Sequence, residues 1–324
     1  MSADEFSFIS ELARFAGQSE ESLDLADDGA LIGKLVLVKD LVQAGIHALP
    51  DDNDADVVRK AIRVNLSDLA AMAAQPKFIL LGLCLGTKSK PGQMPALAET
   101  IRKECEHFAV HLIGGDTVQG SGPTTVSITA IGEVKHSPVL RSGGQIGDNV
   151  WVSGSIGDGA LGLKWLQMGQ QNPELSKLDA KDTDYLAQRY RWPQPRIALG
   201  YQLASLAHCM IDISDGLAAD AGHLARASNL SLVIETEKIP VSAAFQNWRN
   251  RNGSPAEQWK TLSAGDDYEL LFSAPMEARR EIEVVAAKTG CPVTRIGHLE
   301  AGNGVVLRLN GAVVDWPVSG FTHF

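Results

Sequence analysis

The chain has 324 residues, of which 44% are hydrophobic and 21% are charged, and its formal net charge is −10. A chain of this length suits about two globular domains of about 150 residues, each with its own core. The negative charge argues against a general affinity for nucleic acid or for an anionic membrane, since both reward clusters of Lys and Arg. A phosphate-bearing ligand is therefore expected to arrive together with metal cations.

The N-terminal segment from Met1 to Phe6 has neither the basic nor the apolar part of a secretory signal. The densest apolar run, residues 78–85, is far shorter than the roughly 20 residues that a membrane-spanning helix needs. The four cysteines are widely separated and form no Cys-x-x-Cys pair: Cys84, Cys105, Cys209 and Cys291. These features predict a cytoplasmic protein with reduced thiols and no membrane partner.

The first half of the chain mixes helical and extended patterns. Helical spacing over residues 5–15 is followed by an alternating, β-rich run over residues 31–38 that ends at Asp40. The pattern then predicts a helix over 54–75, a strand over 77–85, a helix over 95–109, a short strand ending at 114–116, and a strand over 124–134. No strict alternation of single strands and helices is present.

The helix predicted over residues 54–75 has a mixed surface. Its polar face consists of Asp56, Lys60, Arg63 and Ser67. Asn65 and Asp68 fall nearly opposite that face, toward the interior. An ionised carboxylate directed inward costs several kcal/mol unless it is paired or bound to metal, so Asp68 needs a partner.

The segment 136–148 contains Pro138 and a cluster of glycines, and it predicts the passage between domains of residues 1–137 and 138–324. The second half has a strand over 149–153, helices near 158–169 and 181–207, and a strand leading into Asp212. A helix from Leu217 and strands near 231, 268, 293 and 305 follow.

Aspartates in short Gly- or Ser-rich contexts recur along the chain and are its most informative feature. They are Asp27-Asp28-Gly29, Asn65-Leu66-Ser67-Asp68, Gly114-Gly115-Asp116-Thr117, Asp212-Ile213-Ser214-Asp215-Gly216 and Gly265-Asp266-Asp267. Two carboxylates about 4 Å apart repel by roughly 4 kcal/mol at an effective dielectric near 20, so their convergence requires cations. A ligand set of carboxylate oxygens favours magnesium or manganese over zinc.

Each of these motifs also has an ordinary structural explanation. The Gly114–Thr117 segment alone is more simply a glycine turn, and acid pairs in loops are most often solvated turns. The junction at 212–217 offers free backbone N–H groups that attract phosphate, but Ser214 or Asp215 also suits the cap of the following helix. Capping explains one of these polar residues and not three.

Isolated candidates are weaker. His47 is as readily a packed histidine as a functional one, and Arg141 suits either a phosphate contact or a salt bridge at the domain seam. The chain has no Gly-x-Ser-x-Gly elbow around Ser214 and no Gly-x-x-x-x-Gly-Lys-Ser/Thr loop. Serine hydrolase and P-loop chemistry therefore lose support.

Taken together and in this order, the motifs resemble the thiamine-monophosphate kinase family, of the superfamily that includes aminoimidazole ribonucleotide synthetase and selenophosphate synthetase. The resemblance covers nearly the whole chain. Besides the aspartate motifs it includes Glu5-Phe6, Gly45-Ile46-His47, Arg141-Ser142-Gly143, Pro193-Gln194-Pro195-Arg196, Gly222-His223, Tyr268-Glu269-Leu270-Leu271-Phe272 and Gly320-Phe321-Thr322-His323-Phe324.

The resemblance implies a two-domain α/β (α+β) fold like that of aminoimidazole ribonucleotide synthetase. Residues 1–137 would form an N-terminal domain that binds ATP and metal, with a sheet that pairs with its twin across a homodimer. Residues 138–324 would form an α/β C-terminal domain that completes the active-site cleft.

The implied activity is direct in-line transfer of the γ-phosphoryl group of ATP to thiamine monophosphate, which gives thiamine diphosphate in its biosynthesis. The acceptor oxygen is already anionic, so catalysis rests on positioning and on several magnesium ions rather than on a general base.

By resemblance, the residues fall into four groups. Asp28, Asp40, Asp68, Asp116, Asp212 and Asp215 are metal ligands, and Asp40, Asp116 and Asp215 are the catalytic residues. Gly115, Asp116, Arg141 and Ser214 contact the nucleotide. His47, Asp266 and Trp316 contact the thiamine substrate.

One departure from the family pattern motivates an alternative function. Val38 and Lys39 precede Asp40 where the family commonly has two hydroxyl residues, and the Lys39 ammonium would take up space meant for a cation. The chain would then be a non-catalytic binder of thiamine phosphates or nucleotide. A second alternative keeps the fold and makes the chain another ATP-using enzyme of the same superfamily.

Overall fold

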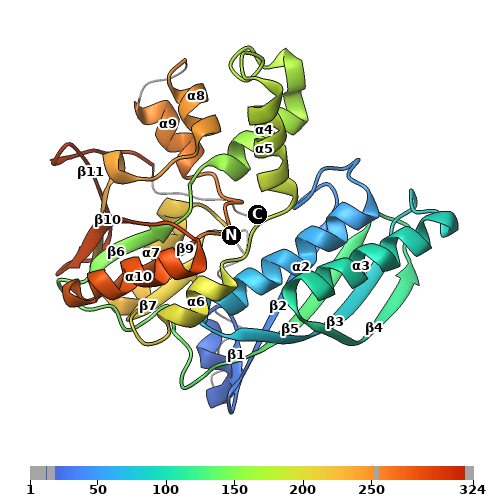
Figure 1. Ribbon diagram of the computed structural model, residues 1–324, viewed down its shortest axis with the longest axis horizontal. Coiled ribbons are helices and arrows are strands. Elements are labelled where there is room, and N and C mark those ends of the chain that lie inside the picture. Colours follow the sequence, from blue (N-terminus) through green and yellow to red (C-terminus); the bar gives the residue numbers. More distant parts are fainter. Residues whose placement is uncertain (1–11, 13–18, 252–254, 318–324) are drawn as a thin grey trace.

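The computed structural model of the chain describes residue 12, residues 19–251 and residues 255–317. Two sheets organise this part of the chain, one of five strands from the first half and one of seven strands from the second (Figure 1). The predicted mixed α/β class with two domains is confirmed. Apart from residue 12, the helix predicted over 5–15 lies outside the described residues, and so does the closing motif at 320–324.

The first half contains a mixed sheet of strand order β1-β2-β5-β3-β4. Its elements are η1 (Glu20–Leu25), β1 (Ala30–Ile32), β2 (Leu35–Gln43), α2 (Asp54–Ala71), β3 (Gln75–Leu85), η2 (Pro91–Gln93), α3 (Met94–Phe108), β4 (His111–Gln119) and β5 (Thr125–Glu133). The single run predicted over 31–38 is wrong, because the chain turns at Gly33 and Lys34 and pairs β1 with β2 antiparallel. Gly33 has a φ of 63°, which suits a two-residue hairpin turn.

Helices α2 and α3 pack on one face of this sheet (Figure 1). Alternate strand residues such as Val36, Val38 and Ile128 point into that packed layer and are buried. The opposite face is left open in the single chain, where Leu41, Phe78 and other apolar side chains are exposed.

The second half contains a mixed sheet of strand order β12-β11-β8-β10-β6-β9-β7. Its strands are β6 (Asn149–Ser153), β7 (Cys209–Asp212), β8 (Ser231–Glu235), β9 (Leu270–Ala274), β10 (Val293–Glu300), β11 (Gly304–Leu309) and β12 (Ala312–Val313). Its helices are α4 (Asp158–Met168), η3 (Gly169–Gln171), α5 (Ala180–Arg191), α6 (Ile197–Leu203), α7 (Leu217–Ser228), η4 (Thr236–Lys238), α8 (Ala243–Arg249), α9 (Pro255–Leu262), η5 (Met276–Ala278) and α10 (Arg279–Thr289).

The long helix predicted over 181–207 is two helices, α5 and α6. Pro193 and Pro195 lie between them, and proline lacks the N–H group that a continuing helix needs. Helices α8, α9 and α10 were not predicted. No helix in the described ranges has the length and apolar character needed to cross a bilayer.

Helix α2 also packs against the second half of the chain, through α6 and β7. At its crossing with α6, a Cβ atom on Gly200 would lie 2.1 Å from the carbonyl oxygen of Ala70, so the two backbones approach as closely as glycine permits. The polar face of α2 is buried: Lys60, Arg63 and Ser67 are 1%, 8% and 0% exposed. This helix therefore carries polar groups from the first half into the interior of the molecule.

Candidate active site

Three aspartates from distant parts of the sequence converge where the two halves meet. Asp28 lies in the loop before β1, Asp68 on α2, and Asp212 at the end of β7. One carboxylate oxygen from each lies within 4.8 Å of the others. The hydroxyl of Ser67 donates to Oδ2 of Asp212 over 2.5 Å. Ser67 and Asp68 thus reach the same carboxylate, and the prediction that Asp68 lies nearly opposite the polar face is wrong.

The electrostatics of this acidic cluster disfavour three free carboxylates. Burial, the Asp40 charge and the Asp212 charge raise the pKa of Asp68 well above its usual value. Burial and the Asp28 charge raise the pKa of Asp212 to about 8. Such shifts are typical of sites that take up compensating positive charge or protons.

Asp40 lies on β2 next to the cluster. Its backbone N–H donates to Oδ1 of Asn65, which is fully buried on α2, so this hydrogen bond of 2.9 Å fixes the strand against the helix. Burial, followed by the charge of Asp28, raises the pKa of Asp40 to about 6.

Lys39 points away from the cluster, because successive residues of a strand face opposite sides of a sheet. Its Nζ donates to the hydroxyls of Ser127 (2.7 Å) and Thr129 (3.4 Å) on the outer face of β5. Within one chain, the expectation that this ammonium occupies cation space beside Asp40 is wrong.

The loop after β7 is held by a carboxylate that the sequence analysis missed. Oδ2 of the buried Asp220 accepts the backbone N–H groups of Ser214, Asp215 and Gly216 at 3.1, 3.2 and 3.1 Å. The expected free N–H donors for phosphate at this junction are therefore already bonded. Neither Ser214 nor Asp215 caps α7, whose N-cap is Gly216. An acid on the otherwise buried face of α7 was the available signal for Asp220.

Asp215 also belongs to a second group of possible metal ligands, with Asp220 and His223, whose ligand atoms lie within 4.8 Å of one another. One carboxylate oxygen of Asp220 already accepts the N–H groups of the loop. Burial, followed by the charge of Arg141, lowers the pKa of His223 to about 4, which keeps the imidazole neutral.

A cavity of about 490 Å³ opens beside Asp40 and Asp215. Its polar lining also includes His47, Ser214 and Asp266, and both halves of the chain contribute to its wall. A volume of this size suits a small organic ligand. The lining of this cavity thus combines three predicted metal or nucleotide residues (Asp40, Ser214 and Asp215) with two predicted substrate residues (His47 and Asp266).

Two of the three substrate candidates, His47 and Asp266, share a buried partner. Oδ1 of Asp266 lies 2.7 Å from Nζ of Lys60, and the same ammonium donates to the carbonyl oxygen of His47 over 2.8 Å. The next acid, Asp267, faces away, since its carboxylate accepts the backbone N–H groups of Gly157 and Gly159. The adjacent acids predicted as one motif therefore have separate tasks.

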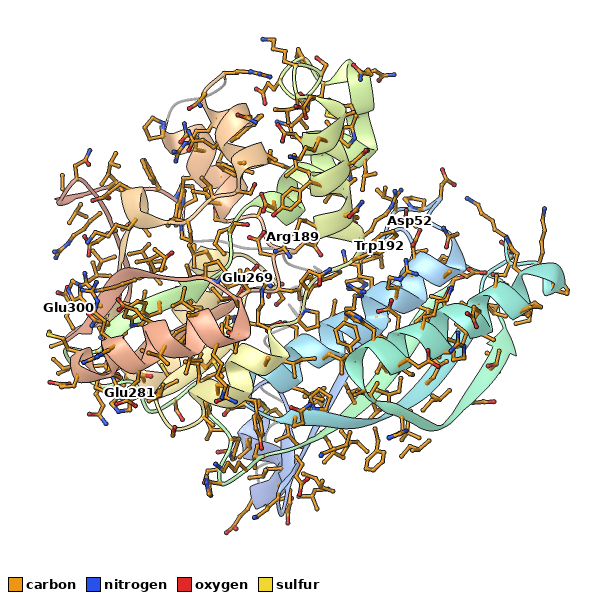
Figure 2. The ribbon with its side chains drawn as sticks, viewed as in Figure 1. Asp52, Arg189, Trp192, Glu269, Glu281 and Glu300 are labelled. Atoms are coloured by element: carbon orange, nitrogen blue, oxygen red, sulfur yellow. The ribbon has the colours of Figure 1, made fainter. Side chains whose placement is uncertain are left out.

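Residues at the end of α5 and just after it attach the second half of the chain to the loop that carries His47 and to the first turn of α2. Arg191 pairs with Asp52 over 2.9 Å, and the indole N–H of Trp192 donates to Asp56 over 2.8 Å. Figure 2 shows Asp52 and Trp192 near each other at the end of α2. Deeper in the molecule, Arg189 pairs with the fully buried Glu269 over 2.9 Å, and these two are also close in Figure 2.

Asp116 and Gly115 are not brought to the acidic cluster within one chain. They lie on the edge strand β4, and β3 and β5 lie between it and β2. At the usual strand spacing, β4 and β2 are therefore about 14 Å apart. Asp116 is exposed. A Cβ on Gly115 would lie 2.1 Å from the carbonyl oxygen of Leu81, so packing against β3 explains this glycine.

Two other predicted contacts lie elsewhere. Arg141 is paired inside the protein: its backbone N–H donates to Asp27 over 2.6 Å and its Nε to Asp28 over 3.1 Å. Trp316 packs on Trp259, with ring centroids 5.9 Å apart, in a hollow of about 270 Å³ that does not share lining residues with the His47 cavity.

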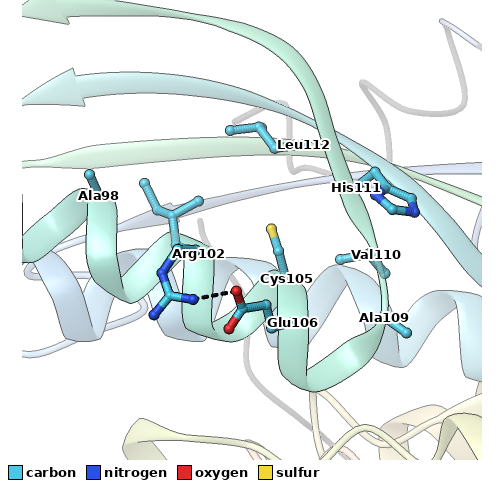
Figure 3. A pocket seen from close by; sticks show the side chains of 9 residues that line it. Ala98, Arg102, Cys105, Glu106, Ala109, Val110, His111 and Leu112 are labelled. Carbon is cyan, nitrogen blue, oxygen red and sulfur yellow. Dashed lines mark hydrogen bonds and ion pairs between the residues drawn. The ribbon is translucent and has the colours of Figure 1, made fainter.

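A second hollow of about 490 Å³ lies between α3 and β4 (Figure 3). Its wall includes Cys105, Val110 and Leu112, and its charged residues Arg102 and Glu106 pair with each other. It lacks the converging carboxylates of the first cavity, which is therefore the better candidate for the active site.

Comparison with known proteins identifies the family. The family models described as AIR synthase related protein, N-terminal domain and C-terminal domain, match residues 26–134 and 145–310. The thiamine-monophosphate kinase of Escherichia coli (strain K12) is 36% identical and covers 100% of this chain and 99% of its own. That of Haemophilus influenzae is 37% identical and covers 93% of this chain and 92% of its own. The chain is a member of the thiamine-monophosphate kinase family.

The fold agrees with this family. The solved structure of AaThiL complexed with AMPPCP and TMP matches with a TM-score of 0.83 at 30% identity, over 99% of this chain and 97% of that one. The AIR synthase related N-terminal match ends at residue 134 and the C-terminal match begins at residue 145. The predicted boundary between residues 137 and 138 falls in the unmatched passage and stays a prediction.

Proposed function

We propose that this chain is an ATP-dependent kinase that transfers the γ-phosphoryl group of ATP to thiamine monophosphate and gives thiamine diphosphate. The observation that carries the proposal is the convergence of Asp28, Asp68 and Asp212 beside a cavity lined by His47 and Asp266. Membership of the thiamine-monophosphate kinase family supports the choice of substrate. The cytoplasmic location stays a prediction from the sequence.

Magnesium ions fit the acidic cluster. Asp28, Asp68 and Asp212 offer only oxygen ligands, which hard cations prefer, and their mutual repulsion is relieved by a divalent ion. Asp40 and Asp215 would extend the ligand set, since both line the cavity beside the cluster and the charges of Asp28 and Asp215 raise the pKa of Asp40. When bound, magnesium would neutralise the charge that accumulates between the phosphates.

The protein's own part in the reaction is positioning. Among the described lining residues of the cavity there is no Lys or Arg, so the lining itself supplies no positive side-chain charge for the phosphates. His47 and Asp266 would orient the acceptor, and the loop fixed by Asp220 would keep Ser214 and Asp215 in place. Since the acceptor oxygen is anionic, no residue is required to remove a proton.

A homodimer would complete the site. Three of the five strands of this sheet, β2, β3 and β4, expose apolar side chains, and the edge strand β4 is exposed along its whole length: examples are Leu41, Phe78, Leu80, Ile113 and Val118. Contiguous apolar surface of this kind is typical of an interface. In such a dimer, Asp116 and Gly115 of one chain would reach the acidic cluster of the other.

The alternative of a non-catalytic binder loses its motivation, because Lys39 bonds to Ser127 and Thr129 instead of facing Asp40. The alternative of another ATP-using enzyme of the superfamily has no specific observation in its favour. If the wild-type protein had a low turnover and Lys39→Thr raised it strongly, the non-catalytic binder would again be the favoured function.

The test is formation of thiamine diphosphate from thiamine monophosphate and ATP by the purified protein, with and without magnesium. We expect product and ADP in equal amounts, and only with magnesium. ATP binding without any thiamine diphosphate, at any magnesium concentration, would contradict the proposed function.

A further inference from the structure

Lys60 is a buried cation just behind the wall of the cavity. It lies on α2 and is 1% exposed, although it does not line the cavity itself. Its Nζ meets a carboxylate, a carbonyl oxygen and an aromatic face: Asp266 at 2.7 Å, His47 at 2.8 Å, and the ring centroid of Tyr190 at 3.8 Å. A lysine ammonium has three donors, and here each has a partner.

These partners come from three separate elements. His47 lies in the loop after β2, Tyr190 on α5, and Asp266 in the loop before β9. A buried ammonium is costly unless it is paired, so the three partners and the lysine hold one another in a single arrangement.

Two of the partners belong to the substrate end of the candidate site. The carbonyl group that Lys60 binds is that of His47, and the carboxylate is that of Asp266. The backbone of Asp266 has a φ of 61°, in the left-handed region that aspartate tolerates better than most residues with a side chain, and its N–H donates to the carbonyl oxygen of Ser214 over 2.9 Å. The backbone bond holds the Asp266 main chain, and the salt bridge to Lys60 holds its carboxylate.

The positive charge of Lys60 also affects the electrostatics of the cavity wall. The described lining of the cavity contains Asp40, Asp215 and Asp266 but no lysine or arginine. Lys60 therefore offsets the negative charge of Asp266 from behind, where it does not take up space in the cavity. Without it, Asp266 would add an unpaired negative charge to the wall that receives a phosphate ester.

We propose that Lys60 is a positioning residue for the phosphate-acceptor substrate. It acts through Asp266 and the His47 peptide, which it holds in the orientation that binds the acceptor. This inference rests on the proposed function, because it names a determinant of acceptor binding in that same site.

The test compares steady-state kinetics of the wild-type protein with Lys60→Met, Lys60→Gln and Lys60→Arg. We expect Lys60→Met to raise the KM for thiamine monophosphate at least tenfold while the KM for ATP changes less than threefold. Lys60→Arg keeps the charge and should recover part of the loss. The matched control Lys103→Met removes an exposed lysine of α3 and should leave both KM values unchanged.

A double-mutant comparison separates positioning from general stability. If Lys60 acts through Asp266, then Lys60→Met should raise the KM for thiamine monophosphate much less in an Asp266→Asn background than in the wild type. Lys60→Gln serves the same comparison if Lys60→Met does not fold. Equal increases in both backgrounds, or equal changes in both KM values, would overturn the proposal.

The outcomes also separate this inference from the proposed function. A wild-type protein that makes no thiamine diphosphate overturns both. An active wild type with a Lys60→Met variant whose KM for thiamine monophosphate stays within twofold overturns the role of Lys60 alone.

Discussion

The hydroxyl of Ser67 on α2 donates a hydrogen bond of 2.5 Å to Oδ2 of Asp212 at the end of β7. This bond joins the two halves of the chain at a carboxylate of the candidate metal site. Asp68, the next residue on the same helix, reaches the same carboxylate. The position of α2 against β7 therefore determines how closely the acidic residues approach one another.

Asp68→Asn should abolish formation of thiamine diphosphate while the protein remains folded, because it removes a charge that would hold magnesium and not a packed apolar side chain. We expect turnover to fall at least a hundredfold, with a far-ultraviolet circular dichroism spectrum like that of the wild type. Asp184→Asn, at an exposed position of α5, is the matched control and should keep full activity. Unchanged turnover of Asp68→Asn would contradict the metal assignment.

The acidic cluster should make stability depend on pH. The pKa values of Asp40 and Asp212 in the folded protein, about 6 and about 8, lie above the ordinary value of 3.8. The folded protein thus holds more protons than the unfolded chain between pH 4 and 8. Without magnesium, the free energy of unfolding should therefore fall as pH rises through this window.

Magnesium should reverse this trend, since it binds the deprotonated carboxylates and displaces their protons. We expect added magnesium to raise Tm by several degrees at pH 8 and by less at pH 6, and chelation to cancel the gain. Thermal unfolding at both pH values, with and without magnesium, measures this. An equal rise in Tm at the two pH values would show that these carboxylates are not the magnesium ligands.

Alanine substitutions at two helical glycines, Gly222 and Gly200, should change the free energy of unfolding in opposite directions. Alanine favours a helix over glycine by about 1 kcal/mol, so Gly222→Ala, where the added Cβ meets no atom within 3.4 Å, should raise the free energy of unfolding by about 0.5–1 kcal/mol. Gly200→Ala should instead lower it by about 2–3 kcal/mol, because its Cβ would collide with the carbonyl oxygen of Ala70. Denaturant unfolding of both variants measures the difference, and a stabilised Gly200→Ala would disprove the close crossing of α2 and α6.

The proposed dimer predicts complementation between two inactive variants. If Asp116 acts on the cluster of the partner chain, a dimer of one Asp68→Asn and one Asp116→Asn subunit keeps one intact site. Random pairing of equal amounts should then restore about a quarter of the wild-type activity, since half of the dimers are mixed and each has one working site. Each variant alone should be inactive, and no recovery on mixing after dissociation and reassociation would place Asp116 in its own chain's site.

Local signals in the sequence predicted most of the elements. The strands over 77–85 and 124–134 and the helix from residue 54 have strong periodic patterns, and the structure places strands and a helix there. The hairpin at Gly33 was missed because a short turn interrupts the period without ending the apolar pattern. The break between α5 and α6 did have a signal in the sequence, Pro193 and Pro195, which the single predicted helix overlooked. Helices α8 and α9 are only 7 and 8 residues long, which is too short for a clear pattern.

The candidate site was predicted in composition but not in geometry. The sequence indicated Asp28, Asp68 and Asp212 as metal ligands, and the structure brings them together. It did not indicate Asp220, whose task is to bind three backbone N–H groups, nor the burial of Lys60. Both depend on which elements become neighbours, and that is decided by contacts between residues distant in sequence.

The buried polar face of α2 has a consequence for building chimeric proteins. Lys60 and Ser67 belong to the first half of the chain by sequence, yet their partners Asp266 and Asp212 belong to the second. An exchange of one half between two homologues would separate these pairs unless both members are exchanged together. Because α2 also packs on the first sheet, a chimera cut at the passage between the sheets keeps these pairs only when both parent proteins have the same residues at positions 60, 67, 212 and 266.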